Sequence, residues 1–118
     1  MRPIRLSVSG AAGKTAPVIL DTYRAPFSVG VNVALTGSGP PTCTYTVEYT
    51  YDDVFSSTYD PDAASAQWIT ASAFSPSKNA SAEGTLTSPV TAVRLNASAL
   101  SAGGTLAMTV IQAGMPGG

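Results

Sequence analysis

Strict alternation over three long stretches is the feature that most constrains this chain. In "PFSVGVNVALTG" every second residue from Phe27 to Leu35 is apolar, and in "TCTYTVEYTY" the residues alternate in the same way from Cys43 to Tyr51. A third stretch, "TLAMTVIQ", repeats the pattern from Leu106 to Val110. Successive side chains of a β-strand point to opposite faces, so a period of two predicts half-buried strands.

Five shorter stretches are further strand candidates: "IRLSV", "PVIL", "QWITA", "EGTLT" and "VTAVRLNAS". Turn-forming residues separate them, and no segment has a sustained helical period, although "DPDAASAQW" could form one short turn. Seven to nine strands at this spacing predict an all-β fold, an antiparallel β-sandwich of the jelly-roll kind. We expect residues 1–118 to form a single domain. "VALTGSGPPTCTYTV" predicts a hairpin, whereas the pairing order of the other strands stays open.

The apolar faces of the strongest strands predict the core. Trp68 is added because its size favours burial. The predicted core residues are Val29, Val31, Val33, Val47, Trp68, Leu106, Met108 and Val110. Residues 1–5 and 113–118 lack apolar alternation, and we expect them to serve as contact arms.

Charge is scarce in this chain. Charged residues make up 11% of 118, and the net charge is −1. A nucleic-acid binder normally has a basic face, so no nucleic-acid partner is expected. The chain has no polybasic run, no long apolar run and no secretory signal, so we expect no membrane partner and synthesis in a cytoplasm. A weakly charged surface favours coverage by neighbouring subunits, and we expect a homo-oligomer.

Four of the seven acidic residues lie within eleven positions: Asp52, Asp53, Asp60 and Asp62. Clustered carboxylates on a loop are typical calcium ligands, but the EF-hand spacing is absent. Asp60-Pro61-Asp62 is ordinary turn chemistry, and Asp52-Asp53 can end a strand by bonding its own backbone. We therefore predict no metal site. Nothing in the spacing supports a pair of glycosidase carboxylates either.

The inventory of reactive side chains argues against an enzyme. Histidine is absent, which removes the Ser-His-Asp and Cys-His constellations, and the lone Cys43 alternates with core positions. "GAAGKT" lacks the earlier glycine of a phosphate-binding loop, because Val8 stands there. A Ser-Lys pair with Lys14 or Lys78 is the one nucleophilic constellation that this inventory leaves. We predict no catalytic residues and no cofactor.

Aromatic residues offer a binding alternative. Flat rings can stack on sugars, although aromatics on strands usually pack in the core. A glycan-stacking platform would draw on Trp68, Tyr23, Tyr49, Tyr51 and Tyr59.

Arg94 lies in the middle of the strand-like "PVTAVRLNAS". A mid-strand arginine needs a carboxylate partner or a neighbouring protein. Asp52 or Asp53 is the predicted partner, which would make that acidic pair structural.

Three sequence segments together resemble small structural proteins of tailed bacteriophage virions: "TVEYTYDDVF", "SPVTAVRLNAS" and "GGTLAMTVIQAG". The resemblance covers roughly residues 17 to 114. It extends to the order in which these segments follow one another along the chain. It implies a non-enzymatic virion protein that decorates or cements the capsid shell. Its partners would be the major capsid protein and copies of itself, on the capsid surface of a particle assembled in a bacterial cytoplasm. No catalytic, cofactor or metal residue is implied.

Two other roles remain open on these residues. The first is a tail, connector or fibre-base protein, which is also structural but differently placed. The second is a carbohydrate-binding module that contacts a host surface through the aromatic residues.

Overall fold

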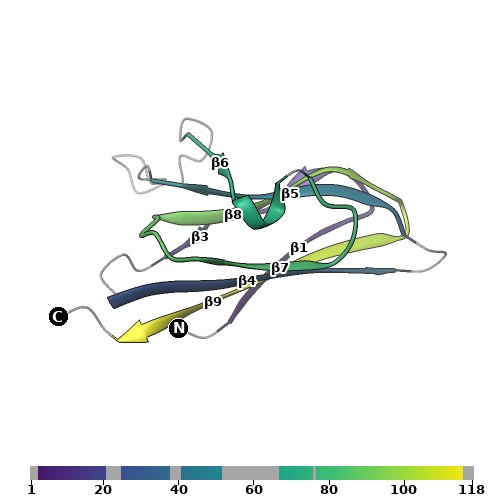
Figure 1. The fold of residues 1–118 in the computed structure, drawn as a ribbon. Coiled ribbons are helices and arrows are strands. Elements are labelled where there is room, and N and C mark those ends of the chain that lie inside the picture. The colour runs from purple at the N-terminus through teal and green to yellow at the C-terminus, as the bar shows by residue number, and fades with distance from the viewer. Residues whose placement is uncertain (1–2, 21–24, 38–40, 52–66, 76, 116–118) are drawn as a thin grey trace, which may run out of the picture.

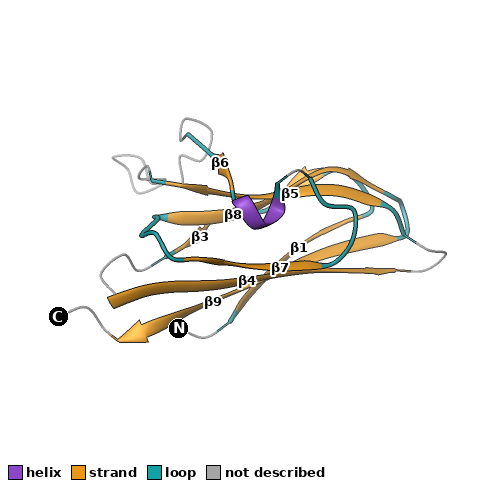
Figure 2. Ribbon diagram, in the orientation of Figure 1, coloured by secondary structure: helices purple, strands orange, loops and turns teal. Residues whose placement is uncertain are grey.

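The computed structural model describes residues 3–20, 25–37, 41–51, 67–75 and 77–115. Two antiparallel sheets pack face to face in these residues, so the predicted β-sandwich is confirmed (Figure 2). One 3₁₀ turn, η1 (Ser72–Phe74), is the exception to strands and loops in the described part of the chain. No helix there is long and apolar enough to cross a membrane.

The first sheet, sheet A, has four strands in the order β1-β9-β4-β7 (Figure 1). Their bounds are β1 (Ile4–Ser9), β9 (Gly104–Met115), β4 (Ala25–Gly37) and β7 (Ala82–Leu86). The two longest strands, β4 and β9, form its centre and pair from Gly37↔Gly104 to Ala25↔Met115, with an irregularity between Ala25 and Ser28. The edge strands β1 and β7 extend the sheet on either side.

The second sheet, sheet B, is built around β8 (Ala92–Leu100) and β5 (Cys43–Thr50). On its far side β8 pairs with two short strands in turn, β2 (Gly13–Lys14) and β3 (Val18–Ile19). β6 (Ile69–Thr70) pairs with the far side of β5. The short strand β2 comes from the "GAAGK" stretch, which none of the strand candidates of the sequence includes.

Consecutive strands mostly belong to different sheets. β4 lies in sheet A and β5 in sheet B, so the hairpin predicted for "VALTGSGPPTCTYTV" is wrong. The Gly/Pro-rich connection takes the chain from one sheet to the other, and each of its two strands finds its partners far along the sequence. The same holds for the connections from β7 to β8 and from β8 to β9.

The core lies between the sheets and is formed by the apolar faces that alternation predicts. Seven of the eight predicted core residues are at most 3% exposed: Val29, Val31, Val33, Val47, Leu106, Met108 and Val110. Trp68 is the error, because it is only half-buried and its ring contacts Arg94. Tyr45, Phe74 and Leu95 supply the large buried side chains instead.

Both segments predicted as contact arms include residues that belong to strands. Ile4 and Arg5 lie in β1, and β9 continues to Met115. The first and last strands pair with each other, with Ile4 opposite Val110. Residues 1–2 and 116–118 lie outside the described residues.

Two glycines of sheet A provide a matched test of the packing between the sheet and η1. A Cβ at Gly84 would lie 2.5 Å from the Cβ of Ala73 and 3.0 Å from Cε2 of Phe74. We expect Gly84→Ala to displace η1 and to lower the free energy of unfolding by about 1–3 kcal/mol. Urea denaturation followed by circular dichroism measures this change.

Gly30→Ala is the control, because its Cβ would meet only Ile111, with Cγ2 at 3.5 Å, an ordinary contact. The control should be unchanged or more stable by up to about 1 kcal/mol. Equal stability of the two variants would contradict the tight contact between Gly84 and η1.

Candidate functional site

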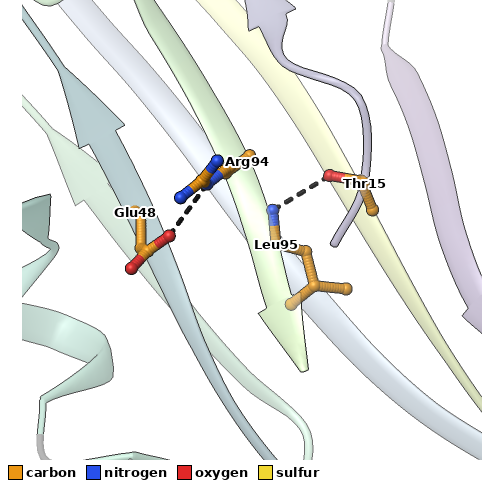
Figure 3. A network of polar contacts seen from close by, with 4 residues as sticks. All are labelled: Thr15, Glu48, Arg94 and Leu95. Atoms are coloured by element: carbon orange, nitrogen blue, oxygen red, sulfur yellow. Dashed lines mark hydrogen bonds and ion pairs between the residues drawn. The ribbon is translucent and has the colours of Figure 1, made fainter. Parts of the chain in front are cut away.

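Arg94 projects from the outer face of sheet B. Its neighbours Val93 and Leu95 belong to the core, and the Arg94 side chain lies on the opposite side. Glu48 lies directly across from it on β5, and Arg94 Nε donates a hydrogen bond of 2.9 Å to Glu48 Oε1 (Figure 3). The two side chains are 11% and 14% exposed, so this ion pair is largely shielded from water.

Trp68 completes this group of side chains. Arg94 Cζ lies 4.1 Å from the centroid of the Trp68 ring, within the range of a cation–π contact. Trp68 directly precedes β6, the short edge strand that pairs with β5. The Arg94 cluster, defined as Arg94, Glu48 and Trp68, therefore links β8, β5 and the segment that leads into β6.

Asp52 or Asp53 is the partner that the sequence predicts for Arg94. Both aspartates lie outside the described residues, and the carboxylate that the structure places on Arg94 is that of Glu48. Glu48 went unrecognised because the register of β5 against β8 is needed to bring the two residues together. The available signal was that both occupy polar positions on alternating strands.

Thr15, between β2 and β3, joins these short strands to the side of β8 that faces away from β5. The backbone N–H of Leu95 donates to Thr15 Oγ1 at 3.0 Å (Figure 3). The N–H of Thr15 in turn donates to the Leu95 carbonyl at 3.0 Å. Pro17, two residues on, has no N–H to offer to a ladder. The Thr15 hydroxyl thus satisfies a buried β8 donor where the edge changes from β2 to β3.

Tyr45 is a buried polar group close to the lone cysteine. Its side chain is fully buried, and its hydroxyl donates a hydrogen bond of 2.6 Å to the Ala80 carbonyl. Burial, with a smaller contribution from the charge of Cys43, raises the pKa of Tyr45 to about 12. Burial also raises the pKa of the Cys43 thiol, which keeps it in its weakly nucleophilic form. Cys43 lies in the core as predicted.

The remaining predicted site residues do not converge in the described structure. Asp52, Asp53, Asp60 and Asp62 all lie outside the described residues. Within the described ranges, no three acidic, cysteine or histidine side chains gather as metal ligands. Lys14 lies on the edge strand β2, whereas the backbone of Lys78 pairs with Tyr45 on the far side of β5.

The described aromatic residues do not share one surface. Tyr49 packs against the core and contacts the exposed Tyr51 edge to face, with ring centroids 5.8 Å apart. Trp68 instead covers Arg94 on the outer face of sheet B. Tyr23 and Tyr59 lie outside the described residues.

Large apolar side chains are exposed at several sheet edges. Ile4 lies on β1, Ile19 on β3 and Ile69 on β6, and each of these is an edge strand. Ile19 is the most open of the three, at 42% exposure. Natural monomers usually protect such edges with charged residues. β3 and β6 contain none, whereas β1 has Arg5 beside Ile4.

The outer face of sheet A is a broad surface with few charges. We define it by the side chains that alternate with core residues on its four strands. They are Arg5, Ser7, Gly30, Asn32, Ala34, Thr36, Glu83, Thr85, Thr105, Ala107, Thr109 and Ile111. A shallow depression of about 510 Å³ lies over Gly30, between Ile111, Thr85 and Glu83.

The comparisons with known proteins concern the fold. No protein-family model and no curated protein matches the chain. Among solved structures, the SPBc2 prophage-derived protein YomS is similar, with 9% identity, a TM-score of 0.49 and coverage of 96% of each chain. IMPa from Pseudomonas aeruginosa, solved in complex with an O-glycopeptide, has 16% identity and a TM-score of 0.40. The match covers 96% of this chain but 12% of IMPa.

In the described residues the chain is thus an antiparallel β-sandwich. Neither likeness assigns it a role.

The Arg94 cluster can be tested by a double-mutant cycle. We expect Arg94→Ala and Glu48→Ala to show a coupling energy of about 1–2 kcal/mol, because each single change leaves a shielded charge without its partner. Urea denaturation of the single and double variants measures this coupling.

Fluorescence provides a second readout, since Trp68 is the single tryptophan of the chain. Arg94→Ala should change its emission, whereas the control Arg5→Ala, on the opposite sheet, should leave it unchanged. Additive stability effects together with unchanged emission would show that the cluster is not formed in solution.

Tyr45 predicts an alkaline loss of stability. Its pKa in the folded protein is about 12, against an ordinary value of 10.0, so the folded state retains the proton longer than the unfolded state. The contribution of protonated Tyr45 to the free energy of unfolding is therefore fully present below pH 10 and is lost as the pH rises toward 12. Such a difference in pKa corresponds to roughly 2–3 kcal/mol.

Unfolding of wild type and Tyr45→Phe should be compared from about pH 8 to about pH 11.5, a range that brackets the ordinary tyrosine pKa. At the lower end the variant should be less stable, because it lacks the bond to Ala80, and it should show a shallower alkaline decline. Parallel declines would refute this account of Tyr45.

Proposed function

We propose that this protein is a non-enzymatic structural protein of a tailed bacteriophage virion that decorates the capsid and stabilises the shell. In this role it binds the major capsid protein at the capsid surface, after synthesis in the bacterial cytoplasm. It uses no cofactor and no metal.

The observation that carries the proposal is the position in the fold of the three segments that resemble virion proteins. "TVEYTYDDVF" covers most of β5, "SPVTAVRLNAS" leads into and covers most of β8, and "GGTLAMTVIQAG" forms most of β9. These strands are the centre of sheet B and one of the two central strands of sheet A. The resemblance to virion proteins therefore concerns the residues that build the sandwich.

The sheet edges supply a means of contact. An extended segment of a neighbouring subunit can add to an open edge by main-chain hydrogen bonds, while Ile4, Ile19 or Ile69 fills an apolar recess beside it. Such contacts need not be strong individually. Repetition over a shell adds them together, so each interface can remain small.

Copy number and rebinding test the proposal. Quantitative mass spectrometry of purified particles should find hundreds of copies for a capsid decoration protein, against tens or fewer for a tail, connector or fibre-base protein. Purified protein should also bind particles that lack it, as measured by co-sedimentation. Low copy number without binding to capsids would transfer the assignment to the tail. Glycan binding by the isolated protein, without binding to particles, would favour the carbohydrate-binding alternative.

Edge variants locate the contact. Ile19→Lys and Ile69→Lys change exposed side chains, so we expect each to alter stability by no more than about 0.5 kcal/mol. At least one of them should lower occupancy on particles when it competes with wild type. Ser88→Lys is the control, because it adds the same charge at an exposed loop position. Equal occupancy for all three variants would exclude the edges of sheet B as the contact surface.

A further inference from the structure

The two charged residues on the outer face of sheet A lie on one rung of the sheet. Arg5 pairs with Thr109, Thr109 pairs with Asn32, and Asn32 pairs with Glu83. Arg5 is therefore at one edge of the four-stranded sheet and Glu83 at the other, at the same height along the strands. Arg5 Nε donates to Thr109 Oγ1 at 3.2 Å, which lays the arginine side chain across this face.

The neighbouring rung has a projecting side chain on one central strand and a depression on the other. Ile111 on β9 pairs with Gly30 on β4, and Gly30 pairs with Thr85 on β7. Ile111 is 46% exposed, whereas Gly30 has no side chain and forms the floor of the depression of about 510 Å³. On the other side of the Arg5 rung, the central strands pair Ala34 with Ala107. These residues leave the face low and nearly flat.

We propose that a second copy of this chain docks on the outer face of sheet A, related by a two-fold axis that runs parallel to the strands, midway between β4 and β9. This interface goes beyond the proposed virion role and does not depend on it. A rotation about this axis preserves the height of every rung and exchanges the two sides of the sheet. Each residue on β4 then faces its own cross-strand partner on β9 of the second copy, and β1 faces β7.

The exchange makes the face complementary to itself. Arg5 comes opposite Glu83 of the second copy, and the symmetry creates this attractive contact twice. Ile111 comes opposite Gly30 of the second copy, so that each projection meets a depression, also twice. Ala34 comes opposite Ala107, and these small side chains permit the approach of about 10 Å at which sheets pack.

The other in-plane axis is disfavoured by charge. A two-fold axis across the strands would place each strand on its own copy, with Arg5 facing Arg5 and Glu83 facing Glu83 when the rungs coincide. Like charges in direct opposition are repulsive. Both in-plane axes leave the strands of the two copies aligned, as in face-to-face packing of sheets, so the charges distinguish between them.

The size of the face sets the expected affinity. Four rungs from Thr36–Thr105 to Gly30–Ile111 span about 20 Å, and four strands span about 19 Å, which gives a footprint of roughly 400 Å² per copy. A standard specific interface buries about 800 Å² per partner. We therefore expect a reversible dimer that forms at micromolar or higher concentration.

A charge-exchange experiment tests the proposal by sedimentation equilibrium. Arg5→Glu alone would set a carboxylate opposite Glu83 of the second copy, and Glu83→Arg alone would set a guanidinium opposite Arg5. Each single variant should dissociate about tenfold more readily than wild type, because both contacts become repulsive. An equimolar mixture of the two variants should associate again, because a mixed dimer replaces one repulsive contact by a native pair and the other by its reversed pair. The double variant should likewise associate with itself.

Two further variants complete the test. Lys14→Glu makes the same charge change as Arg5→Glu on sheet B and should dimerise like wild type. Ile111→Ser removes the projection and should weaken the dimer without loss of β-structure by circular dichroism. A wild-type protein that stays monomeric at millimolar concentration would overturn the proposal. So would single reversals without effect, or a mixture that fails to associate.

Discussion

The ladder between β4 and β9 is the constraint on which the rest of sheet A depends. It pairs the two longest strands of the fold, and its regular part runs from Gly37↔Gly104 to Ser28↔Ala113. The period of a strand is two, so a slip of β4 by one residue against β9 would turn Val31 out of the core and bring Asn32 in. The register thus determines at once which residues form the core and which form the outer face.

The layers of the sandwich follow from alternation, and they could be predicted from the sequence. Val29, Val33 and Leu106 are fully buried because every second position on their strands is apolar and faces the other sheet. Trp68 could not be placed in this way, since it lies in a short segment with little alternation. Its indole ring packs on the Arg94 guanidinium instead, so part of this large apolar ring is covered although it lies outside the core.

The pairing of strands could not be predicted, because it depends on contacts between residues far apart in the chain. The Gly/Pro loop before Cys43 suggested a hairpin, since a local turn between alternating stretches often makes one. In this fold the strands before and after the loop pair within different sheets. The partner of Arg94 was missed for the same reason. Its need for a carboxylate was foreseeable, but the choice of Glu48 requires the register of β5 on β8.

Pairing between the first and last strands has a consequence for how the molecule reaches its fold. The contact between Arg5 and Thr109 spans 104 residues of sequence, and the one between Ser9 and Thr105 spans 96. The strand β1 therefore has no partner in its sheet until β9 has been synthesised. Folds dominated by such distant pairings close large loops before they gain compensating contacts, and they fold in milliseconds to seconds rather than microseconds. During that interval β1 is an unprotected strand that can pair with other chains, so the rate of its capture by β9 decides between folding and aggregation.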